Sequence, residues 1–180
     1  MVGHRIGGIP KFTLKSLAKL LNLENKYHIM LSILGEALGI GMQINNDVYD
    51  LFNSLEKTEK DVVGLDISEG KKYLLVIHSY YNGTSKVKEE KLLEILSLRI
   101  KYKMLANDAI EILKENGSLD YAKKVGNDLM IRTWGELKSH VPNKQAKEDL
   151  SSLIDYYVNI LHKITCSSML NAFILLLSCS

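Results

Sequence analysis

Two carboxylates one helical turn apart, with amides beside them, give this sequence its clearest chemistry. Between residues 38 and 71, Gln43, Asn46, Asp47 and Asp50 are spaced at i, i+3, i+4 and i+7, which places them on one face of a helix. The positions around them are apolar, and burying such a polar stripe bare would cost several kcal/mol, so it needs partners. Carboxylate oxygens are ligands that Mg²⁺ prefers. The spacing therefore predicts a divalent-cation site.

A short acidic turn further along the chain ends in lysines. Asp66 precedes Lys71 by five residues, with Glu69 and Gly70 between them. The ammonium of Lys71 is a compact charge that suits phosphate oxygens. Taken alone, each feature also fits a solvent-exposed helix face or an exposed lysine at the start of a helix. Taken together, carboxylates for a metal and a lysine for phosphate favour a diphosphate ligand.

These same residues resemble a known family. The patterns G-x-x-M-Q-I-x-N-D-x-x-D at residues 39–50, G-x-D-I-x-x-G-K at 64–71 and L-L-V-I-H at 74–78 are similar to the second aspartate-rich region of trans-isoprenyl diphosphate synthases. These polyprenyl synthetases make geranyl, farnesyl and geranylgeranyl diphosphates. The resemblance covers about residues 18–161, matches only the C-terminal half of the family's fold, and is greatest to its short-chain, geranylgeranyl-type members.

The resemblance implies a fold and a reaction. Residues 1–163 would form the C-terminal portion of a polyprenyl synthetase domain, an all-α, partial helical bundle of the isoprenoid-synthase type. The family's reaction joins isopentenyl diphosphate to an allylic diphosphate, using Mg²⁺ to hold the diphosphates. The predicted function is therefore that of a partial short-chain prenyltransferase of isoprenoid biosynthesis, with isoprenyl diphosphates as ligands.

The resemblance also assigns roles to particular side chains, while the residues that carry out the catalytic steps stay unassigned. The family binds its diphosphates through aspartate-held Mg²⁺ and through a lysine. Carried over residue by residue, the resemblance implies that Asn46, Asp47 and Asp50 bind the metal and that Gln43 and Lys71 contact the diphosphate or the allylic chain. Asp66 would support these ligands without binding the metal itself.

This chain departs from the family pattern at several ligand contacts. Asn46 stands where the family motif begins with aspartate, and an amide brings an oxygen but no charge. Tyr73 stands where threonine is common, and the family's upstream Lys-Thr pair is missing. The first aspartate-rich motif, D-D-x-x-D, is absent from the sequence. Since the family holds its ions between two such motifs, this chain alone is expected to be catalytically silent.

Three hypotheses account for a helical framework that carries only one of the family's two aspartate-rich motifs. The leading one is a split enzyme, in which a complementing prenyltransferase chain supplies the first motif; a homodimer is a further possible assembly. The second is a non-catalytic partner subunit that modulates an intact prenyltransferase. The third is a truncated gene product.

Composition and charge argue against a nucleic-acid-binding, disulfide-rich, zinc-binding or membrane-anchored protein. Apolar residues make up 46% and charged residues 24% of the 180 positions, with a formal net charge of +2, which is ordinary for a globular chain and too weak for nucleic acid. Two cysteines form neither a disulfide framework nor a zinc spacing. No signal peptide is recognisable at the start, so a cytoplasmic location is predicted. Residues 164–180 form an uncharged apolar tail, shorter than the ~20 residues that span a bilayer, so a membrane anchor is not expected.

Hydrophobic periodicity predicts helices and no strands. Pro10 argues against a helix boundary upstream of it, and Thr13 is a candidate N-cap. Three glycines at positions 35, 39 and 41 indicate either close packing of another helix or room for a ligand chain. Leu74, Leu75, Ile77 and His78 are expected to face inward. The predicted helices span residues 13–21, 26–55, 70–82, 87–98, 101–114, 120–139 and 144–162, with a charged loop at 56–69.

Overall fold

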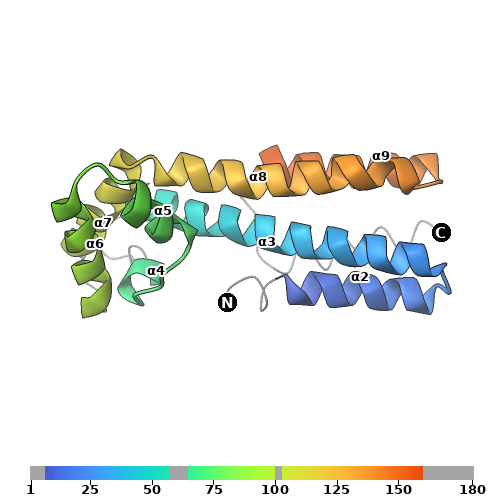
Figure 1. Cartoon of the computed structure of the whole chain (residues 1–180), viewed down its shortest axis with the longest axis horizontal. Helices are drawn as coiled ribbons and strands as arrows, with labels where there is room; N and C mark the ends of the chain where they lie inside the picture. Colours follow the sequence, from blue (N-terminus) through green and yellow to red (C-terminus); the bar gives the residue numbers. More distant parts are fainter. Residues whose placement is uncertain (1–6, 57–64, 100–102, 160–180) are drawn as a thin grey trace. The chain divides into compact units, whose positions relative to one another are not determined.

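The computed structural model of the chain describes residues 7–56, 65–99 and 103–159 (Figure 1). Within these ranges every regular element is helical and no strand is present, so the predicted all-α class is confirmed. The helices are α2 (Gly8–Leu20), α3 (Asn25–Glu56), α4 (Leu65–Ser68), α5 (Leu74–Asn82), α6 (Lys86–Leu98), α7 (Lys103–Glu115), α8 (Ser118–Leu137), the short 3₁₀ helix η1 (Lys138–His140) and α9 (Lys144–Asn159).

The described residues form two compact units. The first unit contains residues 40–127, and the second contains residues 7–39 together with the chain from residue 128 onward. The helices α3 and α8 each contribute residues to both units. The predicted division at residue 163, between synthetase portion and apolar tail, lies outside the described residues and stays a prediction.

The first unit is built around the second half of α3. The helices α4 to α7, drawn in green to yellow-green, lie together in Figure 1; α6 packs on α7, and α4 and α5 each contact both. Among the apolar positions beside the polar face of α3, Val48 and Leu51 are buried, while Ile44 is partly buried against the same core. Other fully or almost fully buried members of this core are Ile67, Leu75, Leu92, Ile110, Leu113 and Ala122.

The start of α5 differs from the prediction. The helix begins at Leu74 rather than Gly70, because Gly70 adopts a left-handed φ of +67° and Tyr73 is extended. The helix buries Leu75, Val76 and Ser79, so the opposite side carries Ile77, which is 47% exposed. The inward position predicted for Ile77 is therefore wrong.

Two other segment boundaries also differ. The predicted loop over residues 56–69 contains α4, a single helical turn too short to leave a periodic signal. In the second unit, α2 begins at Gly8, upstream of Pro10. Proline is tolerated there because the first turn of a helix has no use for its missing N–H. Thr13 does not cap the helix; its hydroxyl donates to the Ile9 carbonyl at 2.9 Å within it.

Helices of the second unit approach one another closely. In Figure 1, α2 runs beside the first half of α3, and a Cβ added to Gly35 would lie only 2.6 Å from the Pro10 carbonyl oxygen. The ion pair from Lys11 to Glu36, at 2.7 Å, joins the same two helices. The Trp134 indole N–H donates to the Ser151 hydroxyl at 3.0 Å, joining α8 to α9. For Gly35, close helix packing is therefore the correct alternative.

A second close approach lies in the first unit. A Cβ on Gly126 of α8 would lie 3.0 Å from the Gly41 carbonyl oxygen of α3, so Gly41 too serves helix packing. Beside it, the buried amide of Asn45 donates to the Asn127 side chain at 2.9 Å. No helix in the described ranges is both long and apolar enough to cross a membrane; residues 164–180 lie outside those ranges.

Candidate functional site

The predicted polar face of α3 lies along the edge of the first unit's core. Asp47 is its innermost member, with only 7% of the residue exposed. Gln43 is half-buried, whereas Asn46 and Asp50 are exposed. The face therefore runs from a buried carboxylate outward to solvent, as a site open to an incoming ligand requires.

Asp47 is held in place and strongly influenced by neighbouring charges. The Gln43 side-chain N–H donates to its carboxylate at 2.7 Å, one helical turn away. Burial raises the pKa of Asp47 to about 6, the Gln43 hydrogen bond opposes that rise, and the charges of Asp66 and Asp50 add to it. The Lys71 ammonium also lowers the pKa of Asp47. The fold thus brings the predicted residues of α3 and of the downstream turn within electrostatic reach of each other.

The turn between α4 and α5 is held by Lys71. Its ammonium donates to the Asp66 carboxylate at 2.5 Å and lies 2.9 Å from the Glu69 carboxylate. These hydrogen bonds, first to Asp66 and then to Glu69, raise the pKa of Lys71 above its ordinary value, so it stays charged. About half of the Lys71 side chain is exposed. The lysine is therefore accessible, and both of its anionic partners belong to the chain itself.

Tyr73 is a site residue that sequence reasoning missed. The side chain is buried, with 5% of the residue exposed, and its hydroxyl has no hydrogen-bond partner among the described residues. Burial raises the pKa of the Tyr73 phenol, and the charges of Asp66, Asp47 and Asp50 raise it further. The phenol is therefore within electrostatic reach of these three carboxylates. The sequence offered one signal, an aromatic residue where the resembled family commonly has threonine, which was interpreted only as a lost contact.

The donor set fits a divalent cation that keeps most of its water. Among the residues that the structure describes, no group of three or more His, Cys, Asp or Glu side chains is placed to hold a metal ion by itself. Mg²⁺ is usually held by one or two carboxylates, with waters and phosphate oxygens completing its shell. Asp47 and Asp50 could supply such a pair, and the nearby Tyr73 hydroxyl has no hydrogen-bond partner among the described residues.

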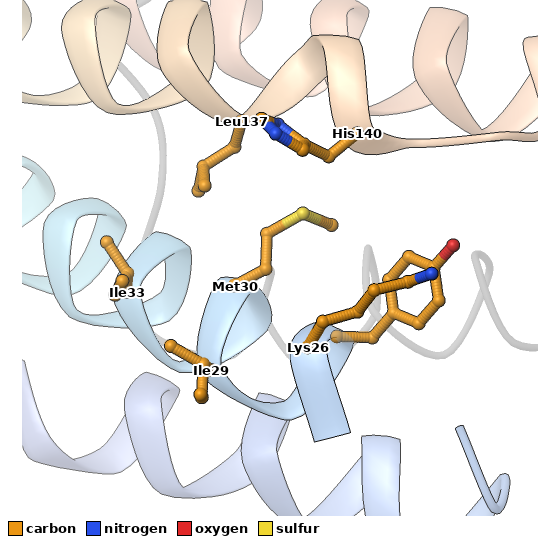
Figure 2. Close-up of a pocket in the computed structure, with 7 residues that line it drawn as sticks. Lys26, Ile29, Met30, Ile33, Leu137 and His140 are labelled. Carbon is orange, nitrogen blue, oxygen red and sulfur yellow. The ribbon is translucent and has the colours of Figure 1, made fainter. Parts of the chain in front are cut away.

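A hollow in the second unit has a different character. Figure 2 shows Ile29, Met30 and Ile33 of α3 opposite Leu137 of α8, around a cavity of about 290 Å³. None of the described residues that line it carries a carboxylate, and Lys26 at its edge already pairs with Glu24 at 2.9 Å. Its walls suit hydrocarbon and offer little to a metal or a diphosphate.

Comparison with known proteins identifies the family of the chain. The sequence profile of the polyprenyl synthetase family matches residues 1–113. A short chain isoprenyl diphosphate synthase of Methanocaldococcus jannaschii is 42% identical over 86 residues, which is 48% of this chain and 25% of the relative. The enzyme of the same name from Methanothermobacter thermautotrophicus is 31% identical over 128 residues, 71% of this chain and 38% of the relative.

A solved structure supports the same assignment. The geranylgeranyl pyrophosphate synthetase from Pyrococcus horikoshii superposes with a TM-score of 0.66 at 30% identity, covering 86% of this chain and 47% of that one. The fold is therefore that of a helical isoprenyl synthase. The chain belongs to the polyprenyl synthetase family, as its motifs predicted. It spans between a quarter and about half of the length of these relatives.

Proposed function

We propose that the α3 face and the downstream turn form the half of a prenyltransferase site that holds Mg²⁺ and a diphosphate group. The observation that supports this most directly is the buried Asp47 carboxylate, whose electrostatic neighbours are Asp50, Asp66 and Lys71. A buried carboxylate among other carboxylates is unfavourable in the absence of a ligand. A bound cation would reverse that cost, which explains why such a group is kept at this edge of the core.

Each predicted residue has a distinct task in this proposal. Asp47 and Asp50 would ligate the cation, with the exposed amide oxygen of Asn46 as an additional ligand. Gln43 fixes the orientation of Asp47 through its hydrogen bond and borders the allylic pocket. In the downstream turn, Lys71 would contact phosphate oxygens and Asp66 would position that lysine.

The proposed reaction is the condensation of isopentenyl diphosphate with an allylic diphosphate. Bound Mg²⁺ would neutralise charge on the departing diphosphate. The chain's own contribution is to orient that diphosphate: Lys71 donates to a phosphate oxygen, and Asp66 limits where the ammonium can lie. Without a D-D-x-x-D motif the chain supplies one side of the clamp. We therefore propose that it acts with a second chain that carries the first motif.

Complementation tests this proposal. Mixing the purified chain with a prenyltransferase fragment that carries D-D-x-x-D should yield isopentenyl incorporation into an allylic product, measured by radiolabel extraction. Neither piece alone should give product, and a mixture made with the Asp47→Ala variant should stay inactive. If both pieces are folded and associated and no product forms, the split-enzyme proposal is wrong.

Restoring the missing charge should strengthen diphosphate binding. The unmodified chain is expected to bind inorganic diphosphate in the ~millimolar range, about −4 kcal/mol, and only with Mg²⁺. Asn46→Asp adds a carboxylate beside the cation, and even a solvent-exposed charge pair is worth about 1 kcal/mol, or about fivefold in affinity. Titration calorimetry with Mg²⁺ and with a chelator measures both effects.

A matched control separates a local from a general charge effect. Asn143→Asp adds the same charge in the second unit, where the side-chain oxygen accepts the Ala146 N–H at 3.0 Å and a carboxylate can do the same. This variant should bind diphosphate like the unmodified chain. An Asn46→Asp variant with unchanged affinity, or equal diphosphate binding in chelator, would refute the metal assignment.

A second candidate function is a non-catalytic subunit that modulates an intact prenyltransferase. The resting ion pairs of Lys71 with Asp66 and Glu69 favour it, because a phosphate must displace at least one of them. The bulky Tyr73 in place of threonine is a further departure at the same turn. Co-purification with a full-length synthase and a change in product chain length would support this function, while activity in the complementation assay would argue for the first.

A further inference from the structure

The Tyr73 hydroxyl is a polar group that the proposed site does not yet use. It is shielded from solvent and has no hydrogen-bond partner among the described residues. Leaving a buried hydroxyl unpaired is costly, and such groups in native proteins usually bond to protein, water or a ligand. Tyr73 is therefore a second and independent sign, besides the acidic cluster, that a small polar ligand belongs at this place.

The surroundings define what that ligand can be. The charges that act on Tyr73 are, in decreasing order, those of Asp66, Asp47 and Asp50. A group as large as diphosphate is unsuited to the hydroxyl, because its oxygen is fully enclosed. A water molecule is small enough, and a water on a cation donates hydrogen bonds more strongly than a free one. Two of the carboxylates whose charges act on the phenol, Asp47 and Asp50, are the oxygen ligands that would hold such a cation.

We infer that the Tyr73 hydroxyl accepts a hydrogen bond from a water molecule in the coordination shell of the divalent cation. Tyr73 is then a positioning residue: it contacts neither metal nor phosphate, and it would orient the hydrated ion that Asp47 and Asp50 hold. The inference rests on the proposed Mg²⁺–diphosphate site and adds a residue for which the threonine of the resembled pattern is no substitute, since only the long aromatic side chain carries a hydroxyl so far from the backbone.

The test is Tyr73→Phe, which removes the hydroxyl and keeps the ring. In chelator, the variant should melt at the same temperature as the unmodified chain or higher, because the lost hydroxyl was unpaired. With Mg²⁺, its affinity for inorganic diphosphate should fall about tenfold or more, as for other residues that orient a metal's ligands. Thermal melts in chelator and calorimetric titrations with Mg²⁺ give the two readouts, which a purely structural role would move together.

The control is Tyr157→Phe. Tyr157 is a buried tyrosine of the second unit, with 6% of the residue exposed, and removal of its hydroxyl should leave the Mg²⁺-dependent binding unchanged. A spectroscopic readout needs no variant: Mg²⁺ should produce a tyrosine near-UV difference spectrum in the unmodified chain. That signal should be absent from Tyr73→Phe and kept in Tyr157→Phe.

The possible failures are distinguishable. If the unmodified chain binds Mg²⁺–diphosphate and Tyr73→Phe binds it equally well, the inference is wrong and the proposed function stands. If the unmodified chain does not bind at all, both are wrong. A third outcome is that Tyr73→Phe melts at a lower temperature in chelator while its Mg²⁺-dependent affinity for diphosphate is unchanged. In that case a permanent buried water satisfies the hydroxyl, and the inference is overturned. Should the variant not fold, a missing tyrosine difference spectrum in the unmodified chain overturns it as well.

Discussion

Replacing Asp47 with Asn is expected to stabilise the metal-free chain while abolishing its Mg²⁺-dependent diphosphate binding. Burial, with the charges of Asp66 and Asp50, raises the pKa of Asp47 from 3.8 to about 6. A shift of that size corresponds to about 3 kcal/mol of lost stability when the carboxylate is ionised. Asn keeps an oxygen that can accept the Gln43 N–H and carries no charge to desolvate. It also lacks the charge that a cation requires.

The sign of the pH dependence follows from the direction of this shift. The pKa of Asp47 is higher in the folded chain than in the unfolded one, so the folded chain binds this proton more tightly. The contribution of Asp47 to stability is complete below about pH 4 and is lost as the pH rises to about 6. Asp47→Asn should therefore equal the unmodified chain near pH 4 and exceed it by about 2–3 kcal/mol near pH 8.

Urea unfolding in chelator at the two pH values measures this difference. Asp50→Asn is the matched control, because Asp50 is exposed on the same face and a surface substitution usually changes stability by less than about 0.5 kcal/mol. Both variants should lose Mg²⁺-dependent diphosphate binding, and Asp47→Asn should gain much more stability than Asp50→Asn, because burial is the larger cause of the pKa shift of Asp47 and the charge of Asp50 is a smaller one. A stability difference that does not change between pH 4 and pH 8 would contradict the electrostatic explanation.

Gly35→Ala is expected to cost stability even though alanine favours helices. The added methyl would lie 2.6 Å from the Pro10 carbonyl oxygen and 2.9 Å from the Lys11 nitrogen. Both neighbours are backbone atoms, so α2 and α3 must separate. Overpacking of this kind usually costs 1–3 kcal/mol, which exceeds the gain of up to about 1 kcal/mol in helix propensity. We expect a net loss of about 1–2 kcal/mol in the free energy of unfolding.

Gly135→Ala provides the comparison. This glycine is also in the second unit, on an exposed position of α8, and an added Cβ would meet nothing within 4 Å. The substitution should therefore stabilise the chain by up to about 1 kcal/mol. Opposite signs for the two glycines in denaturant unfolding would establish that packing decides the result at Gly35. A gain in stability at both positions would contradict this prediction, because it would mean that α2 and α3 can move apart at little cost.

The sequence predicted the long elements well and the short ones poorly. The helix expected at residues 26–55 is found at Asn25–Glu56, because 32 residues leave a repeated apolar pattern. A four-residue helix such as α4 leaves none. The start of α5 was missed because the pattern of apolar residues cannot show that Gly70 adopts a positive φ, which ends the regular backbone before Leu74.

The candidate site was predictable to the same limited degree. Helical spacing placed Asp47 and Asp50 on one face of α3, but only packing against the core decides that Asp47 is buried and Asp50 exposed. The pairing of Lys71 with Asp66 depends on the path of the turn. The buried position of Tyr73 depends on the contacts of α5 with the rest of the first unit. The burial of Asp47 and Tyr73 is a tertiary property, and the Lys71 pair depends on a turn conformation; the pattern of apolar residues encodes neither.

The resting charge at the turn sets an order of events. The carboxylates of Asp66 and Glu69 pair with the Lys71 ammonium, and the charges of Asp66 and Asp50 act on the buried Asp47. A free diphosphate would have to compete with these carboxylates for Lys71. In the proposed site the cation would therefore bind first, or arrive already bound to the diphosphate, and it would leave with the diphosphate or after it.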